Sequence, residues 1–133
     1  PKSFAEDDKT EHYTNRNERV RSKSEKMIAD EFYRYQIPYK YEHPLCMTIW
    51  GKETTFYPDF TVLSRRTGKE IIIEHLGMMD DSTYVSNAMR KLELYEKNGY
   101  LLGKNLLIFH ETSESPLSVK IVKQYIEEYL MNI

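Results

Sequence analysis

Several features are missing from this sequence, and each absence excludes a class of protein. Cys46 is the only cysteine among the 133 residues, so an internal disulfide is impossible and the cytoplasm is the expected compartment. No apolar run approaches the roughly 20 residues of a membrane span, and no signal-peptide pattern opens the chain. What remains is the composition of an ordinary globular domain, with 40% hydrophobic and 30% charged residues.

Common catalytic and metal-binding patterns are also absent. The sequence has no paired-cysteine motif and no His-Glu-x-x-His, and its four histidines fall on separate predicted elements, which argues against a zinc site. It has no Gly-x-Ser-x-Gly, and Cys46 within an apolar run is expected in the core. A serine or cysteine hydrolase therefore has no support.

The charge balance does not point to a nucleic-acid binder. The net charge is −2, whereas many proteins that bind nucleic acid carry a strongly basic face. Basic residues nevertheless gather between residues 16 and 26, after an acidic stretch, and include Arg21 and Lys23. This local basic face predicts phosphate contacts, although a solvated helix start explains it equally well.

The centre of the chain predicts an antiparallel hairpin. Two runs rich in aromatic and β-branched residues, 57–62 and 71–77, flank a short polar segment. A turn between them places Asp59 opposite Glu74, and a bulge at Gly68 would shift this pairing by about one residue. Opposed carboxylates repel each other, so this arrangement favours a cation between them.

The remaining elements follow from periodicity and from helix caps. We expect a helix over 22–35, strands over 39–45 and 106–109, a helix over 83–98, and a helix after Pro116. Residues 46–50 can extend the first strand toward a turn at Gly51. This order predicts one α/β domain over residues 16–133, with a mixed four-stranded sheet flanked by helices, after a polar, flexible segment over residues 1–15.

Glu25 has two competing interpretations. Ser22 and Glu25 fit a capping box, in which the Glu25 carboxylate bonds back to the first backbone amide of the helix. On a helical wheel Glu25 also falls within the apolar stripe that includes Ile28 and Phe32, which turns it toward the sheet. The sequence leaves both open.

The order of these motifs resembles the core of the PD-(D/E)XK nuclease superfamily. The segments Tyr57-Pro58-Asp59-Phe60 and Glu74-His75-Leu76-Gly77, after a helix with an inward glutamate, are similar to a branch of predicted nuclease domains. The third motif of that branch reads Glu-His-x-Gly, and some of its members are attached to helicases. The resemblance extends from Ser22 to the final helix and implies a restriction-endonuclease-like core of order αβββαβα.

The same resemblance implies a chemistry and its residues. A Mg²⁺ or Mn²⁺ ion would be held by Asp59, Glu74 and the backbone carbonyl of His75, with Glu25 in contact through water. The implied reaction is hydrolysis of DNA phosphodiester bonds to 5′-phosphate and 3′-hydroxyl ends. Duplex or branched DNA is the implied partner, with a homodimer or attachment to a larger protein left open and no membrane partner.

One departure from the superfamily pattern divides the functional hypotheses. Leu76 stands where the pattern has lysine, two residues after the glutamate. Lys91 shares a helix face with Ala88 and Tyr95, and we expect it to replace that lysine; the less favoured alternative is a lysine that extends to solvent. The first hypothesis is a metal-dependent endonuclease; the second is an inactive nuclease-fold module for nucleic-acid binding or assembly.

Overall fold

The computed structural model describes residues 3–4 and 10–131 of the chain. Within these residues the fold is mixed α/β, with three α-helices and a four-stranded mixed sheet. The strands are β1 (His12–Tyr13), β2 (Arg19–Val20), β3 (Tyr39–Tyr41), β4 (Leu45–Ile49), β5 (Lys52–Phe56), β6 (Phe60–Leu63), β7 (Glu70–Leu76) and β8 (Leu106–His110). The helices are α1 (Lys23–Arg34), α2 (Ser82–Lys97) and α3 (Val119–Tyr125), the last continuing as the π-helix η1 (Ile126–Leu130). In the described part of the chain, no helix is long and apolar enough to cross a membrane.

The main sheet has the strand order β3-β6-β7-β8. The first two neighbouring pairs are antiparallel, and β8 lies parallel to β7 after the crossover through α2, as the sequence predicts. In the β6–β7 hairpin Phe60 lies opposite Ile73 and Val62 opposite Ile71. This register is the predicted one, without a shift at Gly68, and its continuation sets Asp59 beside Glu74.

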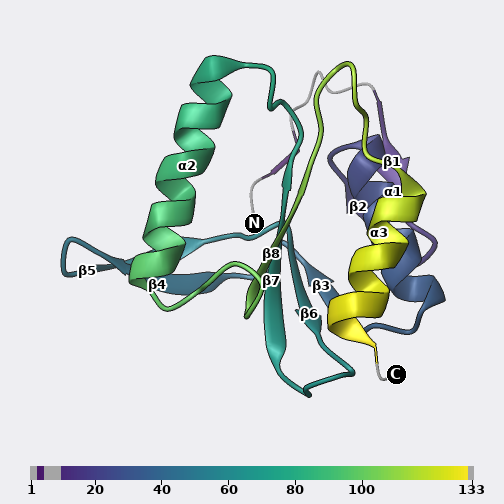
Figure 1. Cartoon of the computed structure of the whole chain (residues 1–133), viewed down its shortest axis with the longest axis horizontal. Coiled ribbons are helices and arrows are strands. Elements are labelled where there is room, and N and C mark those ends of the chain that lie inside the picture. The colour runs from purple at the N-terminus through teal and green to yellow at the C-terminus, as the bar shows by residue number, and fades with distance from the viewer. Residues whose placement is uncertain (1–2, 5–9, 132–133) are drawn as a thin grey trace.

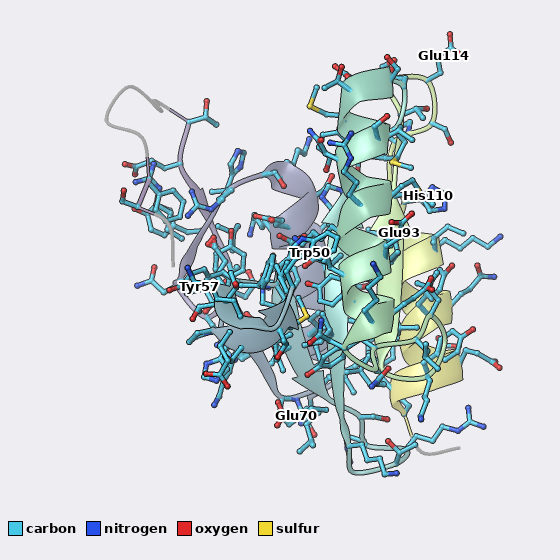
Figure 2. The ribbon with its side chains drawn as sticks, turned by 90° about the vertical axis from the view of Figure 1, so that its left-hand side faces the viewer. Trp50, Tyr57, Glu70, Glu93, His110 and Glu114 are labelled. Carbon is cyan, nitrogen blue, oxygen red and sulfur yellow. The ribbon has the colours of Figure 1, made fainter. Side chains whose placement is uncertain are left out.

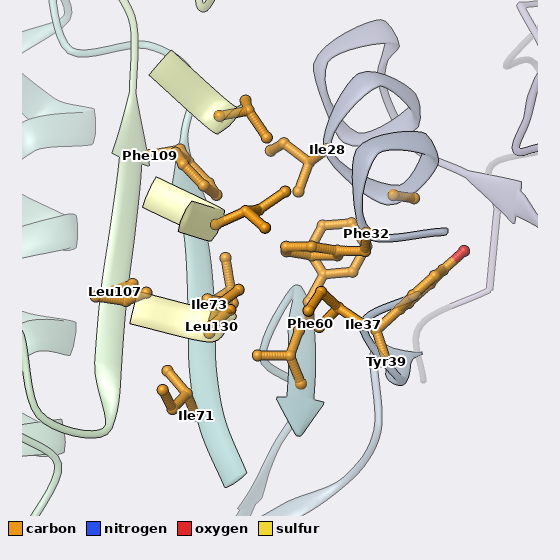
Figure 3. Packing of buried hydrophobic residues seen from close by; sticks show 14 of the residues in the cluster. Ile28, Phe32, Ile37, Tyr39, Phe60, Ile71, Ile73, Leu107, Phe109 and Leu130 are labelled. Carbon is orange, nitrogen blue, oxygen red and sulfur yellow. The ribbon is translucent and has the colours of Figure 1, made fainter. Parts of the chain in front are cut away.

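The sheet is covered on both faces. Helix α2 lies on one side, and α1 and α3 lie on the other (Figure 1). Because side chains alternate along a strand, Ile71 and Ile73 join the core with α1 and α3, while Ile72 packs with Tyr95 of α2. Figure 3 shows the larger core, which includes Phe32 and Phe60. Their rings pack edge to face, with the centroids 5.5 Å apart. Glu74 thus faces α2.

The observed architecture differs from the predicted one at residues 45–56. They do not extend β3 but form a separate two-stranded sheet, the β4–β5 hairpin, which projects past the C-terminal end of α2 (Figure 1). The chain leaves β3 at Glu42, where φ is +48. Cys46 lies opposite Thr55 on the hairpin and is exposed, so the prediction that it belongs to the core is wrong.

The N-terminal segment is only partly described. Residues 5–9 of the predicted flexible stretch lie outside the described residues. On its C-terminal side, His12 and Tyr13 form β1, which pairs antiparallel with β2. The domain boundary at residue 16 stays a prediction.

Candidate active site

A cleft opens where the main sheet, α2 and the β4–β5 hairpin meet. It has a volume of about 440 Å³. Its lining residues come from the segment before α1, from the residue that follows β3, from β5 and the segment between β5 and β6, and from α2: Arg21, Glu42, Thr55, Phe56, Tyr57, Asp59 and Lys91. The fold therefore brings Asp59 and Lys91, which the sequence places on different elements, to one opening.

Glu74 lies on the α2 face of β7 and contacts Lys91, one of the residues that line the cleft. It is 3% exposed, and each of its carboxylate oxygens accepts a hydrogen bond. The Tyr95 hydroxyl donates to Oε1 at 2.6 Å, and the Lys91 ammonium donates to Oε2 at 3.0 Å. Both donors project from α2 one turn apart, so the helix spacing itself directs them to the same carboxylate. A buried charge needs such partners, since an unpaired one is strongly destabilising.

Asp59 is held by one hydrogen bond and has a shifted pKa. Its Oδ2 accepts a hydrogen bond from the His75 backbone amide at 2.7 Å, which ties the start of β6 to β7. Burial, followed by the negative charges of Glu74 and Glu25, raises the pKa of Asp59 well above its usual value, against the opposing effects of the His75 amide and Lys91. The carboxylates of Asp59, Glu74 and Glu25 are therefore close enough for their charges to act on one another, with Lys91 acting in the opposite direction.

Glu25 is buried, as its inward-facing interpretation requires, but its carboxylate bonds to the Arg21 amide and not to the Ser22 amide that a capping box would use. The Ser22 side chain accepts from the Glu25 amide at 3.1 Å, which confirms Ser22 as the helix cap. The Glu25 carboxylate is buried, and its Oε1 accepts from the backbone amide of Arg21 at 2.9 Å and from the Tyr41 hydroxyl at 2.7 Å. Its amide partner is thus one residue before the cap. Glu25 is also close enough to Asp59 for its charge to act on the pKa of that carboxyl.

His75 points to the opposite face from Glu74, as expected for a regular strand. Its Nε2 lies 2.8 Å from Oε2 of Glu111, which also accepts from the Ser24 hydroxyl at 2.7 Å. Burial by itself would raise the pKa of Glu111, but the hydrogen bonds with His75 and Ser24 outweigh it and lower that pKa. This cluster connects β7, the residue after β8 and the first turn of α1, and so fixes the helix that carries Glu25.

Glu111 is a residue of the site region that the sequence does not reveal. It follows the short apolar run of β8, with no motif around it, and its partners are far away along the chain. The only clue in the sequence to a close contact at His75 is Gly77, two residues later in the third motif. A Cβ atom at position 77 would lie 3.0 Å from Cε1 of His75, so glycine leaves room for the imidazole.

Gly77→Ala should therefore destabilise the fold by displacing the His75 ring and weakening its contact with Glu111. The backbone of Gly77 does not have a positive φ, so the effect comes from crowding rather than from backbone strain. We expect the free energy of unfolding to fall by about 1–3 kcal/mol, measured by urea denaturation.

A double-mutant cycle with His75→Ala provides the control for this prediction. Once the imidazole is gone, the added methyl group of Gly77→Ala has nothing to displace, and its cost should largely disappear. An equal loss of stability in both backgrounds would contradict the proposed contact.

The two predicted nucleic-acid contacts lie at the start of α1. The Arg21 Nε donates to Oε1 of Glu42 at 2.6 Å, and its guanidinium lies 4.5 Å from the Phe4 ring centroid. Lys23 is exposed in the first turn of the helix. Arg21 borders the cleft, while Lys23 is absent from its lining.

The carboxylates have the donor chemistry of a site for a hard divalent cation. In the part of the chain that the structure describes, no three His, Cys, Asp or Glu side chains form a ready-made metal centre. Asp59 and Glu74 nevertheless supply oxygen ligands of the kind that Mg²⁺ and Mn²⁺ prefer. Burial first, and then the charges of Glu74 and Glu25, disfavour the ionised form of Asp59 and raise its pKa. A divalent cation bound beside Asp59 would favour the ionised carboxylate again.

Comparisons with known proteins place no constraint on these residues. No protein-family model matches the chain, and no curated protein matches it.

Proposed function

We propose that this chain is a metal-dependent endonuclease with a restriction-endonuclease-like core, and that it hydrolyses phosphodiester bonds in DNA. The observation that carries the proposal is that Asp59 and Lys91 line one cleft, with the Lys91 ammonium 3.0 Å from the buried carboxylate of Glu74. Two adjacent carboxylates and a lysine are the groups that metal-assisted phosphate hydrolysis uses.

In this proposal each group has a defined task. Asp59, Glu74 and the backbone carbonyl of His75 hold Mg²⁺ or Mn²⁺, and Glu25 makes contact through water. When bound, the ion supplies charge stabilisation for the phosphate and lowers the pKa of water. The Lys91 ammonium donates to the attacking water or to a phosphate oxygen, while Arg21 and Lys23 contact phosphates along the strand.

The contact between Lys91 and Glu74 supports the replacement of the missing motif lysine. Leu76 is 8% exposed and apolar, so it supplies no charge to the site. Lys91 reaches Glu74 from α2 with a side chain that is 35% exposed, which leaves its ammonium accessible from the cleft. The positive charge required beside the glutamate is therefore present, supplied by a helix rather than by the strand.

The test is cleavage of labelled duplex, forked, four-way and single-stranded DNA in Mn²⁺, in Mg²⁺ and in chelator. Cutting that requires the metal supports the endonuclease. Absence of cutting by a protein that binds DNA contradicts it and supports the second candidate.

The second candidate is a nuclease-fold module that binds nucleic acid or assembles with a partner without cleaving. One observation favours it: both oxygens of Glu74 are already satisfied by Tyr95 and Lys91. Such a network can stabilise the fold without a metal. Asp59 weighs against this candidate, because a cleft carboxyl whose pKa is raised by burial and by two neighbouring carboxylates is more typical of a functional site than of a structural network.

A further inference from the structure

The tip of the β4–β5 hairpin carries a residue that neither packing nor turn preference explains. Trp50, the only tryptophan of the chain, is 96% exposed. Ile49 pairs with Lys52, so Trp50 and Gly51 form a two-residue turn, and their φ angles are +52 and +75. Turns of this kind favour Asn-Gly, and a bulky residue at positive φ is strained. Strain of this kind tends to accompany function.

The hairpin holds Trp50 in a fixed position relative to α2. Asn98, at the end of α2, accepts from the Thr48 amide at 2.8 Å and donates to the Thr48 carbonyl at 3.1 Å. Met47 is buried with Tyr95 on the inner side of the hairpin. The hairpin that carries Trp50 is thus anchored to α2, and Trp50 lies on the side of the molecule that faces the viewer in Figure 2.

The surroundings of the indole are cationic. The Lys97 ammonium lies 5.8 Å from the Trp50 ring centroid, and Lys52 is exposed in the same turn. An accessible aromatic face next to ammonium groups is the combination with which proteins bind unpaired nucleic acid, because the ring stacks on a base and the cations contact phosphates.

The hairpin also connects Trp50 with the cleft. Strand β5 runs from Lys52 at the tip to Phe56, which lines the cleft together with Tyr57. Five residues of strand place the tip about 16 Å from the cleft. This is the length of about five stacked nucleotides, so a single strand of that length can extend from the Phe56 end of the cleft to the tip of the hairpin.

We propose that Trp50 is a stacking site for an unpaired base, and that the substrate is therefore DNA with a single-stranded segment, such as a fork or a single strand. The inference rests on the proposed function, since it assigns a substrate class to the same cleft. In a continuous duplex each internal base is stacked on its neighbours, which leaves no face for the indole.

Intrinsic fluorescence tests this directly, because Trp50 is the sole indole. In chelator, which prevents cleavage, forked and single-stranded oligonucleotides should quench the emission in a saturable way, and blunt duplex of the same length should have little effect. Unchanged emission with the forked and single-stranded DNA overturns the proposal, and equal quenching by the duplex overturns its unpaired-base component.

Binding of labelled forked DNA, followed by anisotropy, provides the second measurement. Trp50→Ala should weaken binding by roughly 5- to 150-fold, the effect of losing one stacked base, and Trp50→Phe should restore most of it. Tyr33→Ala is the matched control, since Tyr33 is a 53% exposed aromatic on α1, across the sheet from α2. Equal affinities for wild type and Trp50→Ala overturn the proposal.

The outcomes separate this inference from the proposed function. Metal-dependent cutting that is indifferent to Trp50→Ala, together with unchanged emission, refutes the stacking site and leaves the endonuclease in place. Quenching by forked DNA without any cleavage supports the stacking site and moves the function to the binding module. A wild type that binds no DNA overturns both.

Discussion

Asp59→Asn should abolish metal-dependent cleavage and at the same time stabilise the fold at neutral pH. The first effect follows from the loss of a charged oxygen ligand beside Glu74, and we expect a decrease of at least about 10²-fold in kcat/KM. Glu74→Gln should have a similar effect on cleavage. Isothermal titration with Mn²⁺ should show weakened binding in both variants.

The stability effect has a definite dependence on pH. Burial and the charges of Glu74 and Glu25 raise the pKa of Asp59 in the folded protein above the value of about 3.9 in an unfolded chain. A group with a raised folded pKa contributes stability that is fully present below the unfolded pKa and is lost as pH rises through the folded pKa. The advantage of Asp59→Asn should therefore grow between acidic and neutral pH.

Urea denaturation at a series of pH values measures this difference. Asp80→Asn provides a control of opposite sign, because hydrogen bonds from Ser113 lower the pKa of the exposed Asp80 carboxyl. That variant should lose a little stability at neutral pH and nothing at acidic pH. A stability difference for Asp59→Asn that does not vary with pH would contradict the electrostatic explanation. Full activity in both Asp59→Asn and Glu74→Gln would refute the site.

The parts of the fold with local signals could be predicted from the sequence. The Ser22 and Asp81 side chains both cap helices, and the predicted starts of α1 and α2 lie within one residue of the observed ones. The register of the β6–β7 hairpin was predictable because a shift of one residue would move Ile71 and Ile73 to the other face of the sheet. Asp59 and Glu74 were placed together by that register alone.

The errors come from contacts between distant residues. Leu45, Met47 and Ile49 alternate as in a strand, but alternation does not identify the partner, so residues 46–50 were assigned to the end of β3 instead of a separate hairpin. The exposure of Cys46 follows from that pairing. The contact between Glu111 and His75 also joins elements far apart in the chain and has no local signature.

Lys91 is the residue on which the two functional hypotheses differ most clearly. Its ammonium donates to Glu74 at 3.0 Å from a position at the edge of the cleft. Lys91→Met keeps the apolar stem that packs on α2 neighbours and removes only the charge. If Lys91 stabilises charge on the phosphate, kcat should fall by about 10²–10³-fold, the effect typical of losing one such donor.

The metal affinity gives the complementary measurement. Lys91 opposes binding of a second cation near Glu74, so Mn²⁺ should bind Lys91→Met as tightly as wild type or more tightly. A purely structural lysine predicts a different result: turnover is unchanged at temperatures where the variant is folded, and only the free energy of unfolding is reduced.

Lys91→Arg further separates a catalytic role of Lys91 from a structural one, because it keeps the charge and the contact with Glu74 while altering the geometry of the donor. Partial activity in Lys91→Arg, with almost none in Lys91→Met, would show that the charge missing at Leu76 is supplied from α2.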